Sequence, residues 1–239
     1  MTSTLESPPV RISASLEVRD LFKIFRAAEV QTVALRGVSF KVAPGEFVSI
    51  VGRSGSGKST LFGVLAGLLE PSAGSVLLDG QDLTQLSDDG RAKLRRQRLG
   101  VTFQRDNLLP FLSALENVEL PLKMSGQPRA TQQARALLAE LGLENRIHSR
   151  PAQLSGGEQA SAGLAVALAH GPGLLLADEP TGELDSASTL AVMNLLERLH
   201  REGLTLLVVT HNPEVAARAG RQIRLTDGVL SEVGLEEIL

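Results

Sequence analysis

The chain has 239 residues, which fits one large domain or a core with a subdomain, and its 43% hydrophobic residues exclude a disordered chain. Its formal net charge of −3 gives no support for general nucleic-acid binding, so we expect no nucleic-acid partner. The absence of cysteine excludes disulfides and thiolate metal sites and fits a reducing compartment.

The sequence predicts no membrane segment. No apolar run reaches the roughly 18 residues that a membrane span needs, because His-Gly-Pro-Gly at 170–173 divides the run 160–177. Residues 1–15 lack the apolar core of a signal peptide, so we interpret them as a flexible tail before a single domain at 16–239. We expect a cytoplasmic protein that contacts a membrane only through a partner.

The first elements alternate between strands and turns. The run 33–42 alternates apolar and polar residues, which predicts a half-buried strand, and 16–25 is a plausible partner strand. Residues 47–51 are almost wholly apolar, as in a strand buried on both faces of a parallel sheet. A glycine-rich loop and a helix to about Leu69 follow, and 75–78 is the next predicted strand.

Helical patterns dominate the middle of the chain, as at 131–141. We therefore predict an inserted helical subdomain at about 88–158. Strands return at 174–177 and 206–210, with a helix at 186–200 between them. This alternation predicts an α/β fold with a parallel sheet.

The chain closes with a predicted hairpin at 222–230, which turns at Asp227-Gly228.

The clearest motif is a phosphate-binding loop. Residues 52–59, Gly-Arg-Ser-Gly-Ser-Gly-Lys-Ser, fit the pattern G-x-x-x-x-G-K-[ST] and lie between a buried strand and a helix. Backbone amides of such a loop wrap phosphates. Lys58 is expected to reach the β and γ oxygens, and the Ser59 hydroxyl to bind Mg²⁺. The alternative is an ordinary glycine-rich turn with an incidental lysine.

Acidic residues follow the strand at 174–177. Asp178 is placed to hold Mg²⁺, directly or through water, because the carboxyl end of a buried strand points into the ligand crevice. Glu179 is then a candidate to orient or deprotonate the attacking water. The alternative is an acidic cap on a turn before a helix.

Two further polar residues end strands. His211 follows 206–210 and can hydrogen-bond a γ-phosphate or the nearby water, although a surface histidine opening a loop is the alternative. Gln104 follows 99–101 and can sense Mg²⁺ or water without adding charge, although a polar residue at a strand end explains it as well.

A second helix start points to the same ligand. In Leu-Ser-Gly-Gly-Glu-Gln at 154–159, Ser155 and Glu158 form a capping box before an apolar helix. Paired glycines disfavour a helix unless something approaches the backbone closely. A bare helix N-terminus binds phosphate, so two such sites suggest one nucleotide held from two sides.

Together these motifs resemble the nucleotide-binding subunit of ATP-binding-cassette transporters over about 16–230, in the family's order. The resemblance implies a P-loop ATPase core with a mostly parallel sheet, an N-terminal antiparallel β-subdomain and an inserted helical subdomain. It implies ATP and Mg²⁺ as ligands. It assigns nucleotide contacts to Phe25, Gly52, Ser54, Gly55, Ser56, Gly57, Lys58, Ser59, Thr60, Ser155, Gly156, Gly157 and Asp185, catalysis to Glu179, His211 and Gln104, and Mg²⁺ binding to Ser59, Gln104 and Asp178.

The resemblance also implies partners. The family pairs two domains head to tail, each ATP lying between one phosphate loop and the other copy's Ser155 helix, so a homodimer is expected. Residues 94–122, 177–185 and 208–216 resemble the subgroup for lipoprotein release, macrolide efflux and cell division. That subgroup implies an integral membrane permease docking near Arg105–Leu122 at the inner face of the cell membrane. For residues 108–112 a buried subdomain core is the alternative.

Several positions depart from the family. Ser161 and Val166 stand where arginines are usual, Asn212 replaces an aspartate, Glu183 an asparagine and Phe25 a tyrosine. These changes lower the expectation of fast ATP hydrolysis, while ATP binding is still expected.

Two other functions compete with transport. One is an ATP-dependent regulatory scaffold of a cell-division-type membrane complex without cargo. The other is an ATPase of DNA repair or translation, which is disfavoured because such relatives carry long coiled coils or two cassettes. The basic run 91–98 is interpreted as a solvated helix face rather than a lipid or nucleic-acid patch.

Overall fold

A six-stranded sheet forms the centre of the molecule, whose computed structural model describes residues 13–27 and 30–232. All neighbouring strands in it are parallel except the pair at one edge, and the three strands at its centre are short and apolar, as expected for a buried parallel sheet. The order is β10 (Val229–Glu232), β9 (Arg221–Thr226), β3 (Phe47–Val51), β8 (Thr205–Thr210), β7 (Leu174–Asp178) and β6 (Leu99–Thr102).

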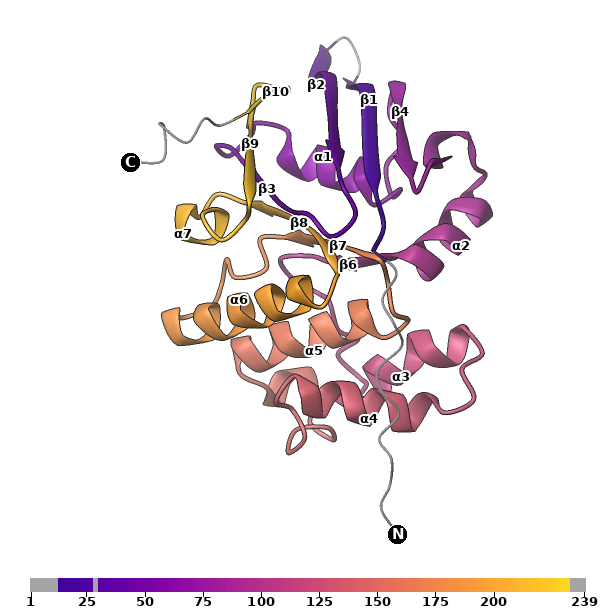
Figure 1. Ribbon diagram of the computed structural model, residues 1–239, viewed down its shortest axis with the longest axis vertical. Helices are drawn as coiled ribbons and strands as arrows, with labels where there is room; N and C mark the ends of the chain where they lie inside the picture. Colours follow the sequence, from indigo (N-terminus) through magenta and orange to yellow (C-terminus); the bar gives the residue numbers. More distant parts are fainter. Residues whose placement is uncertain (1–12, 28–29, 233–239) are drawn as a thin grey trace.

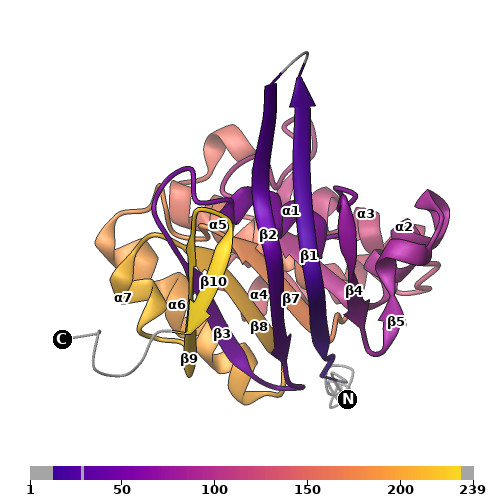
Figure 2. The same ribbon diagram turned by 90° about the horizontal axis from the view of Figure 1, so that it is seen from above.

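A second, antiparallel sheet lies above the first in Figure 1. Its long strands pair with Leu16 opposite Val42, and Figure 2 shows them side by side. Its order is β2 (Val30–Val42), β1 (Leu16–Ala27), β4 (Ala73–Leu78) and β5 (Gln81–Asp82). The predicted α/β class and antiparallel subdomain are confirmed.

Helix α1 (Lys58–Leu65) packs between the two sheets. Its Leu61 and Leu65 join one apolar core with residues of β1, β3 and β8. The prediction that this helix reaches Leu69 is wrong. Gly67 adopts φ 63°, and the amides of residues 68 and 69 both donate to Gly63 O, so the helix closes earlier.

Helices cover the other face of the central sheet. Helices α5 (Gly156–Leu168) and α6 (Ser186–Arg201) pack on it, and α3 (Ala114–Met124) and α4 (Ala130–Glu140) lie beyond α5 (Figure 1). The remaining helices of the described chain are η1 (Leu83–Gln85), α2 (Asp88–Arg98), η2 (Pro151–Gln153) and α7 (Pro213–Ala216).

The predicted helical insertion at 88–158 includes part of the core. Strand β6 pairs with β7 at the edge of the central sheet, and Leu94 of α2 packs in the same core as α1. The separate helical cluster is built from α3, α4 and α5. No helix in the described part of the chain is both long enough and apolar enough to cross a bilayer.

The predicted flexible tail is wrong for its last three residues. Ala14 is fully buried, and its amide donates to Gly173 O at 3.1 Å. Its carbonyl accepts a bond from Thr205 Oγ1 at 2.8 Å, which ties it to the start of β8. Residues 1–12 lie outside the described part of the structure.

Candidate functional site

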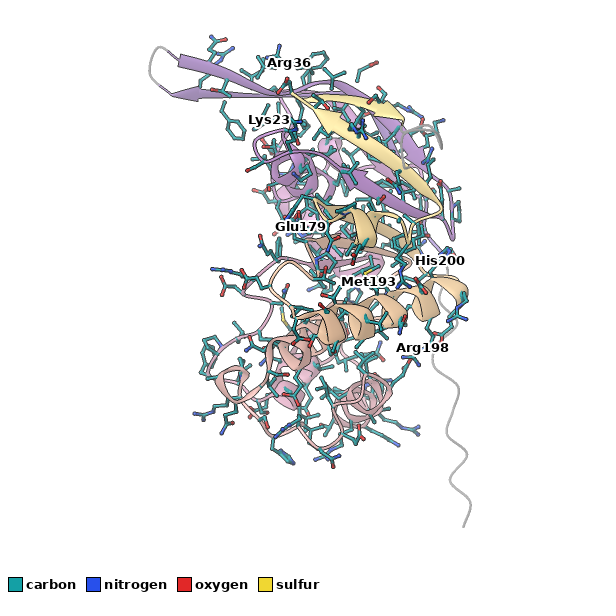
Figure 3. The ribbon with its side chains drawn as sticks, turned by 90° about the vertical axis from the view of Figure 1, so that its left-hand side faces the viewer. Lys23, Arg36, Glu179, Met193, Arg198 and His200 are labelled. Carbon is teal, nitrogen blue, oxygen red and sulfur yellow. The ribbon has the colours of Figure 1, made fainter. Side chains whose placement is uncertain are left out.

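A large cavity of about 1870 Å³ opens at the carboxyl end of the central strands. It lies where β3, β7 and β8 end, and β1, β2 and β9 supply its remaining walls. Figure 3 shows Glu179 between the sheet-rich and the helical halves of the molecule. The cavity is lined by these predicted site residues: Phe25, Gly52, Ser54, Gly55, Ser56, Gly57, Lys58, Ser59, Thr60, Gln104, Asp178, Glu179 and His211.

The phosphate loop is closely packed against the chain's own backbone. A Cβ atom on Gly52 would lie 2.3 Å from Leu225 O, and one on Gly57 would lie 2.5 Å from Ala34 O. Gly57 also adopts φ 103°, which side chains rarely tolerate. Local packing alone therefore requires glycine at both positions.

Three features make this loop suited to binding an anion. The Lys58 ammonium donates to Gly52 O at 2.7 Å and Arg53 O at 3.0 Å, which holds the cation over the loop. Helix α1 begins without a capping side chain or an acidic residue in its first turn, so its first amides keep their partial positive charge. The buried Ser56 hydroxyl has no hydrogen-bond partner among the described residues. The loop therefore fits a phosphate chain.

Phe25 adds an aromatic surface to the lining of the cavity. The residue is 42% exposed, and Lys23 Nζ lies 5.1 Å from the centroid of its ring, within cation–π range. An exposed ring beside a cation suits a flat heterocycle. Sequence reasoning missed Lys23, and it also missed Arg36 and Arg224, which line the cavity from β2 and β9. Arg36 is exposed, whereas Lys23 and Arg224 are half-buried, and the only sequence signal for the three is a basic residue on a strand that has an apolar inner face.

Asp178 ends β7 and is partly buried. Burial raises the pKa of its carboxyl above the usual value, the neighbouring Glu179 raises it further, and Lys58 opposes both effects. A cation would therefore stabilise the ionised form of Asp178. Across the described residues, no group of three His, Cys, Asp or Glu side chains is arranged to hold a metal, so Mg²⁺ would need other ligands, such as a hydroxyl, an amide or phosphate.

Glu179 is held by the end of β8. Its carboxylate accepts bonds from Thr210 Oγ1 at 2.9 Å, from the His211 amide at 2.8 Å and from His211 Nδ1 at 2.5 Å. The residue is 9% exposed. Since a carboxylate accepts from it, Nδ1 carries the ring proton and Nε2 remains available on a side chain that is 65% exposed.

Gln104 lies in the exposed loop after β6. Its Nε2 is 3.3 Å from where a Cβ on Gly182 would lie, so this loop touches the segment after Glu179. Arg105 also forms an ion pair with Glu183 in that segment. Glu183, which departs from the family, thus has a partner within the chain.

Ser155, Gly156, Gly157 and Asp185 do not line the cavity. Ser155 caps α5 as predicted: its hydroxyl accepts from the Glu158 amide at 3.3 Å, and the Glu158 carboxylate accepts from the Ser155 amide at 2.8 Å. The Ser155 side chain also hydrogen-bonds the Glu158 carboxylate, and together these contacts help hold the pKa of Glu158 below its usual value. Glu158 is further held by Arg146 at 2.9 Å.

Asp185 caps α6 in this chain. Its carboxylate accepts from the Ser188 amide at 2.9 Å and from Ser188 Oγ at 3.1 Å, and these bonds hold the pKa of Asp185 below its usual range. Asn212 likewise caps α7, accepting from the Glu214 amide at 2.9 Å. Ser161 and Val166 are both half-buried on α5.

Comparison with known proteins identifies the family. The family profile "ABC transporter" matches residues 35–182. The chain is 46% identical over 220 residues to the macrolide export ATP-binding/permease protein MacB of Syntrophobacter fumaroxidans and 48% identical over 219 residues to that of Marinobacter nauticus. These matches cover 90% and 91% of this chain but 31% and 34% of the relatives, so it spans about a third of their length.

A relative of similar length and a solved structure also match. An uncharacterized ABC transporter ATP-binding protein of Thermotoga maritima is 46% identical, with 89% of this chain and 92% of the relative covered. A dimeric structure of the ATP-binding cassette MJ0796 in a post-hydrolysis state with ADP and Pi aligns with a TM-score of 0.85 and 38% identity, covering 92% of this chain and 99% of that one. The chain therefore belongs to the ABC transporter family and is one of its ATP-hydrolysing cassettes.

Proposed function

We propose that two copies of this chain close around two ATP molecules and drive a membrane permease for export, lipoprotein extraction or mechanotransmission. The observation that supports the proposal is that the predicted site residues lie in two separate places on one chain. The cavity holds the phosphate loop, Asp178 and Glu179, whereas the Ser155 helix start lies outside it. A second copy would bring its Ser155 to the first copy's phosphate loop, as the dimeric arrangement of MJ0796 supports.

ATP would lie along the cavity from Phe25 to the phosphate loop. The ring of Phe25 would stack on adenine, and the amides of α1 and the Lys58 ammonium would bind the phosphates. Ser59, Asp178 and Gln104 would hold Mg²⁺, which neutralises phosphate charge when bound. The packed glycines, the orphaned Ser56 hydroxyl and the burial of Asp178 support this fit.

Glu179 would orient and deprotonate the attacking water, and His211 would hold Glu179 through Nδ1 while Nε2 contacts the terminal phosphate or the water. From the second copy, Ser155, Gly156 and Gly157 would bind the same phosphate, and Asp185 would lie at the seam between the copies.

The membrane partner would dock on the surface near Arg105–Leu122. Leu109 is 40% exposed and Phe111 is 65% exposed there, so the buried-core alternative is wrong for these two side chains. Apolar side chains that remain exposed together mark an interaction surface. Membrane association at the inner face would then be peripheral and depend on this contact.

A mixing experiment tests the shared site. Lys58→Ala removes the phosphate-loop cation, and Ser155→Arg blocks the other half-site. Each variant alone should lose ATP hydrolysis. Mixed in equal amounts, random pairing gives half heterodimers with one intact site each, so activity should return to about a quarter of the wild-type value.

A control must show that activity does not return on mixing any two inactive variants. A second mixture of Lys58→Ala with Glu179→Gln places both defects on the same half-site, so its heterodimers have no intact site and should stay inactive. Equal recovery in both mixtures, or none in either, contradicts the shared site. Glu179→Gln alone should form a stable dimer with Mg-ATP, measured by light scattering.

The permease contact is tested on the exposed surface. Phe111→Ser should reduce co-purification of a membrane protein with this chain, while basal ATP hydrolysis stays unchanged. Leu190→Ser, at a 50% exposed position on α6, is the matched control. A captured membrane protein without transported cargo would favour the regulatory scaffold of a cell-division-type complex instead.

A further inference from the structure

The hydroxyl of Thr210 lies at the centre of a short hydrogen-bond chain. Thr210 is the last residue of β8 and is fully buried. Its Oγ1 lies 3.0 Å from the Asn212 amide nitrogen and 2.9 Å from Glu179 Oε2. These two hydrogen bonds are the reason for a hydroxyl at this position among the described contacts.

The direction of the Thr210 proton follows from these partners. A backbone N–H only donates, so Oγ1 accepts from the Asn212 amide. The hydroxyl proton is then left for the Glu179 carboxylate, which accepts it on Oε2. The other carboxylate oxygen, Oε1, accepts from the His211 amide and from Nδ1. One oxygen of the Glu179 carboxylate is thus hydrogen-bonded to Thr210 and the other to His211.

Glu179 has a strained backbone conformation, so the contacts that hold its side chain matter. Glu179 adopts φ 45°, a conformation that costs a residue with a side chain roughly 1–3 kcal/mol and persists only where surrounding contacts fix it. Its amide donates to Val209 O at 2.8 Å, and its carbonyl accepts from the Gly182 amide at 3.0 Å. These bonds fix the main chain, whereas the carboxylate orientation depends on Thr210 and His211.

We propose that Thr210 is a positioning residue for hydrolysis, which orients the Glu179 carboxylate through its hydroxyl and leaves nucleotide binding untouched. This inference rests on the proposed role of Glu179 in activating water. A buried carboxylate that loses one donor turns toward other partners and is no longer aligned by its remaining bonds. The turnover rate then falls, because fewer molecules hold the carboxylate in the productive orientation.

Three substitutions separate this role from a structural one. Thr210→Val keeps the shape of the side chain and removes the hydroxyl, whereas Thr210→Ser keeps the hydroxyl. Thr205→Val is the matched control, because Thr205 is also fully buried on β8, at its other end. Its Oγ1 likewise makes two hydrogen bonds, to Ala14 O at 2.8 Å and from the Gly45 amide at 2.9 Å.

The first measurement is steady-state ATP hydrolysis by the full chain. Thr210→Val should lower kcat roughly tenfold to a hundredfold with KM for ATP within about twofold of wild type. Thr210→Ser should recover most of the rate. Thr205→Val should lose thermal stability to a similar degree and keep its kcat.

The second measurement needs no nucleotide. The chain has four histidines, so the ring nitrogen signals of His211 can be assigned with a His211→Ala variant. Thr210→Val should move the Nδ1 signal of His211, because the carboxylate bound to it changes position. Thr205→Val and Thr210→Ser should leave it at the wild-type position.

The outcomes distinguish this inference from the proposed function. If Glu179→Gln hydrolyses ATP at the wild-type rate, the role of Glu179 is wrong and the inference fails with it. If Glu179→Gln is inactive while Thr210→Val keeps its kcat and its His211 signal, only the inference fails. A rate loss in Thr210→Val that Ser does not repair, or that Thr205→Val shares, also overturns it.

Discussion

Gly157 of α5 and Ser188 of α6 pack so closely that a Cβ atom on Gly157 would lie 2.6 Å from Ser188 Oγ and 2.8 Å from Ser188 Cβ. Ser188 is itself fixed by Asp185 at the start of α6. Gly157, one of the paired glycines at the start of α5, is therefore explained by contact within the chain. A Cβ on Gly156 would lie 3.3 Å from Leu184 Cδ2, the mobile end of a side chain, which leaves Gly156 as the glycine open to an outside ligand.

We predict that alanine destabilises the fold at Gly157 and has little effect at Gly156. Gly157→Ala forces α5 and α6 apart and should lower the free energy of unfolding by about 1–3 kcal/mol. Gly156→Ala should leave that free energy within about 1 kcal/mol, because Leu184 can move and alanine favours the helix. Urea unfolding of both variants measures the difference. Adding Ser188→Gly to Gly157→Ala should recover part of the loss; no recovery would show that the Ser188 contact is not its cause.

The loss of stability in acid is predicted to depend on Glu17, which lies on β1, an inner strand of the antiparallel sheet. Hydrogen bonds from Arg19 and then Lys41 lower the pKa of Glu17 from 4.5 to about 2. The pKa of this carboxyl is lower in the folded protein than in the unfolded chain. It therefore stabilises the fold fully when the pH lies above its pKa in the unfolded chain, and this contribution is lost as the pH falls toward its pKa in the folded protein. The melting temperatures of wild type and Glu17→Gln should therefore differ by a constant amount from pH 7 to 5 and converge near pH 2. A gap that widens on acidification would contradict the assignment.

The Arg105–Glu183 ion pair should be weak and salt-dependent. The side chains are 72% and 40% exposed, so solvent screens the attraction. A double-mutant cycle with Arg105→Gln and Glu183→Gln should give a coupling energy of about 0.2–1 kcal/mol at low salt. At about 1 M NaCl the coupling should vanish, since the screening length falls to about 3 Å. Coupling that survives high salt would indicate a buried contact instead.

Local patterns predicted much of this fold. The apolar run of β3 and the alternation of β2 fix their burial, because a strand's two faces are set by period 2. The turn at Asp227-Gly228 was predictable because both residues adopt positive φ, which that dipeptide favours in a two-residue hairpin. The phosphate-loop motif was recognisable because it lies in eight consecutive residues, although its Gly52 and Gly57 pack against distant backbone.

Relationships between distant segments were not predictable. The contact of Gly57 with Ala34 and that of Thr210 with Glu179 depend on how β2 and β7 are placed in the two sheets. The burial of Ala14 depends on β8, which begins 191 residues later. A single sequence carries no periodic signal for such pairs, so it indicated the residues near the site but not the bonds that hold them.

Binding measurements with two ligands should distinguish the role of Phe25 from that of Lys58. Phe25→Ala removes the ring that would stack on adenine, and stacking on an aromatic side chain contributes about 1–3 kcal/mol, so affinity for ATP should fall roughly tenfold or more. Affinity for inorganic tripolyphosphate should not change. Lys58→Ala should abolish binding of both, because the phosphates lose the cation held over the loop. Calorimetric titration of each ligand measures these constants. Unchanged ATP affinity in Lys58→Ala would refute the assigned loop, and equal losses of both ligands in Phe25→Ala would refute the placement of the base at Phe25.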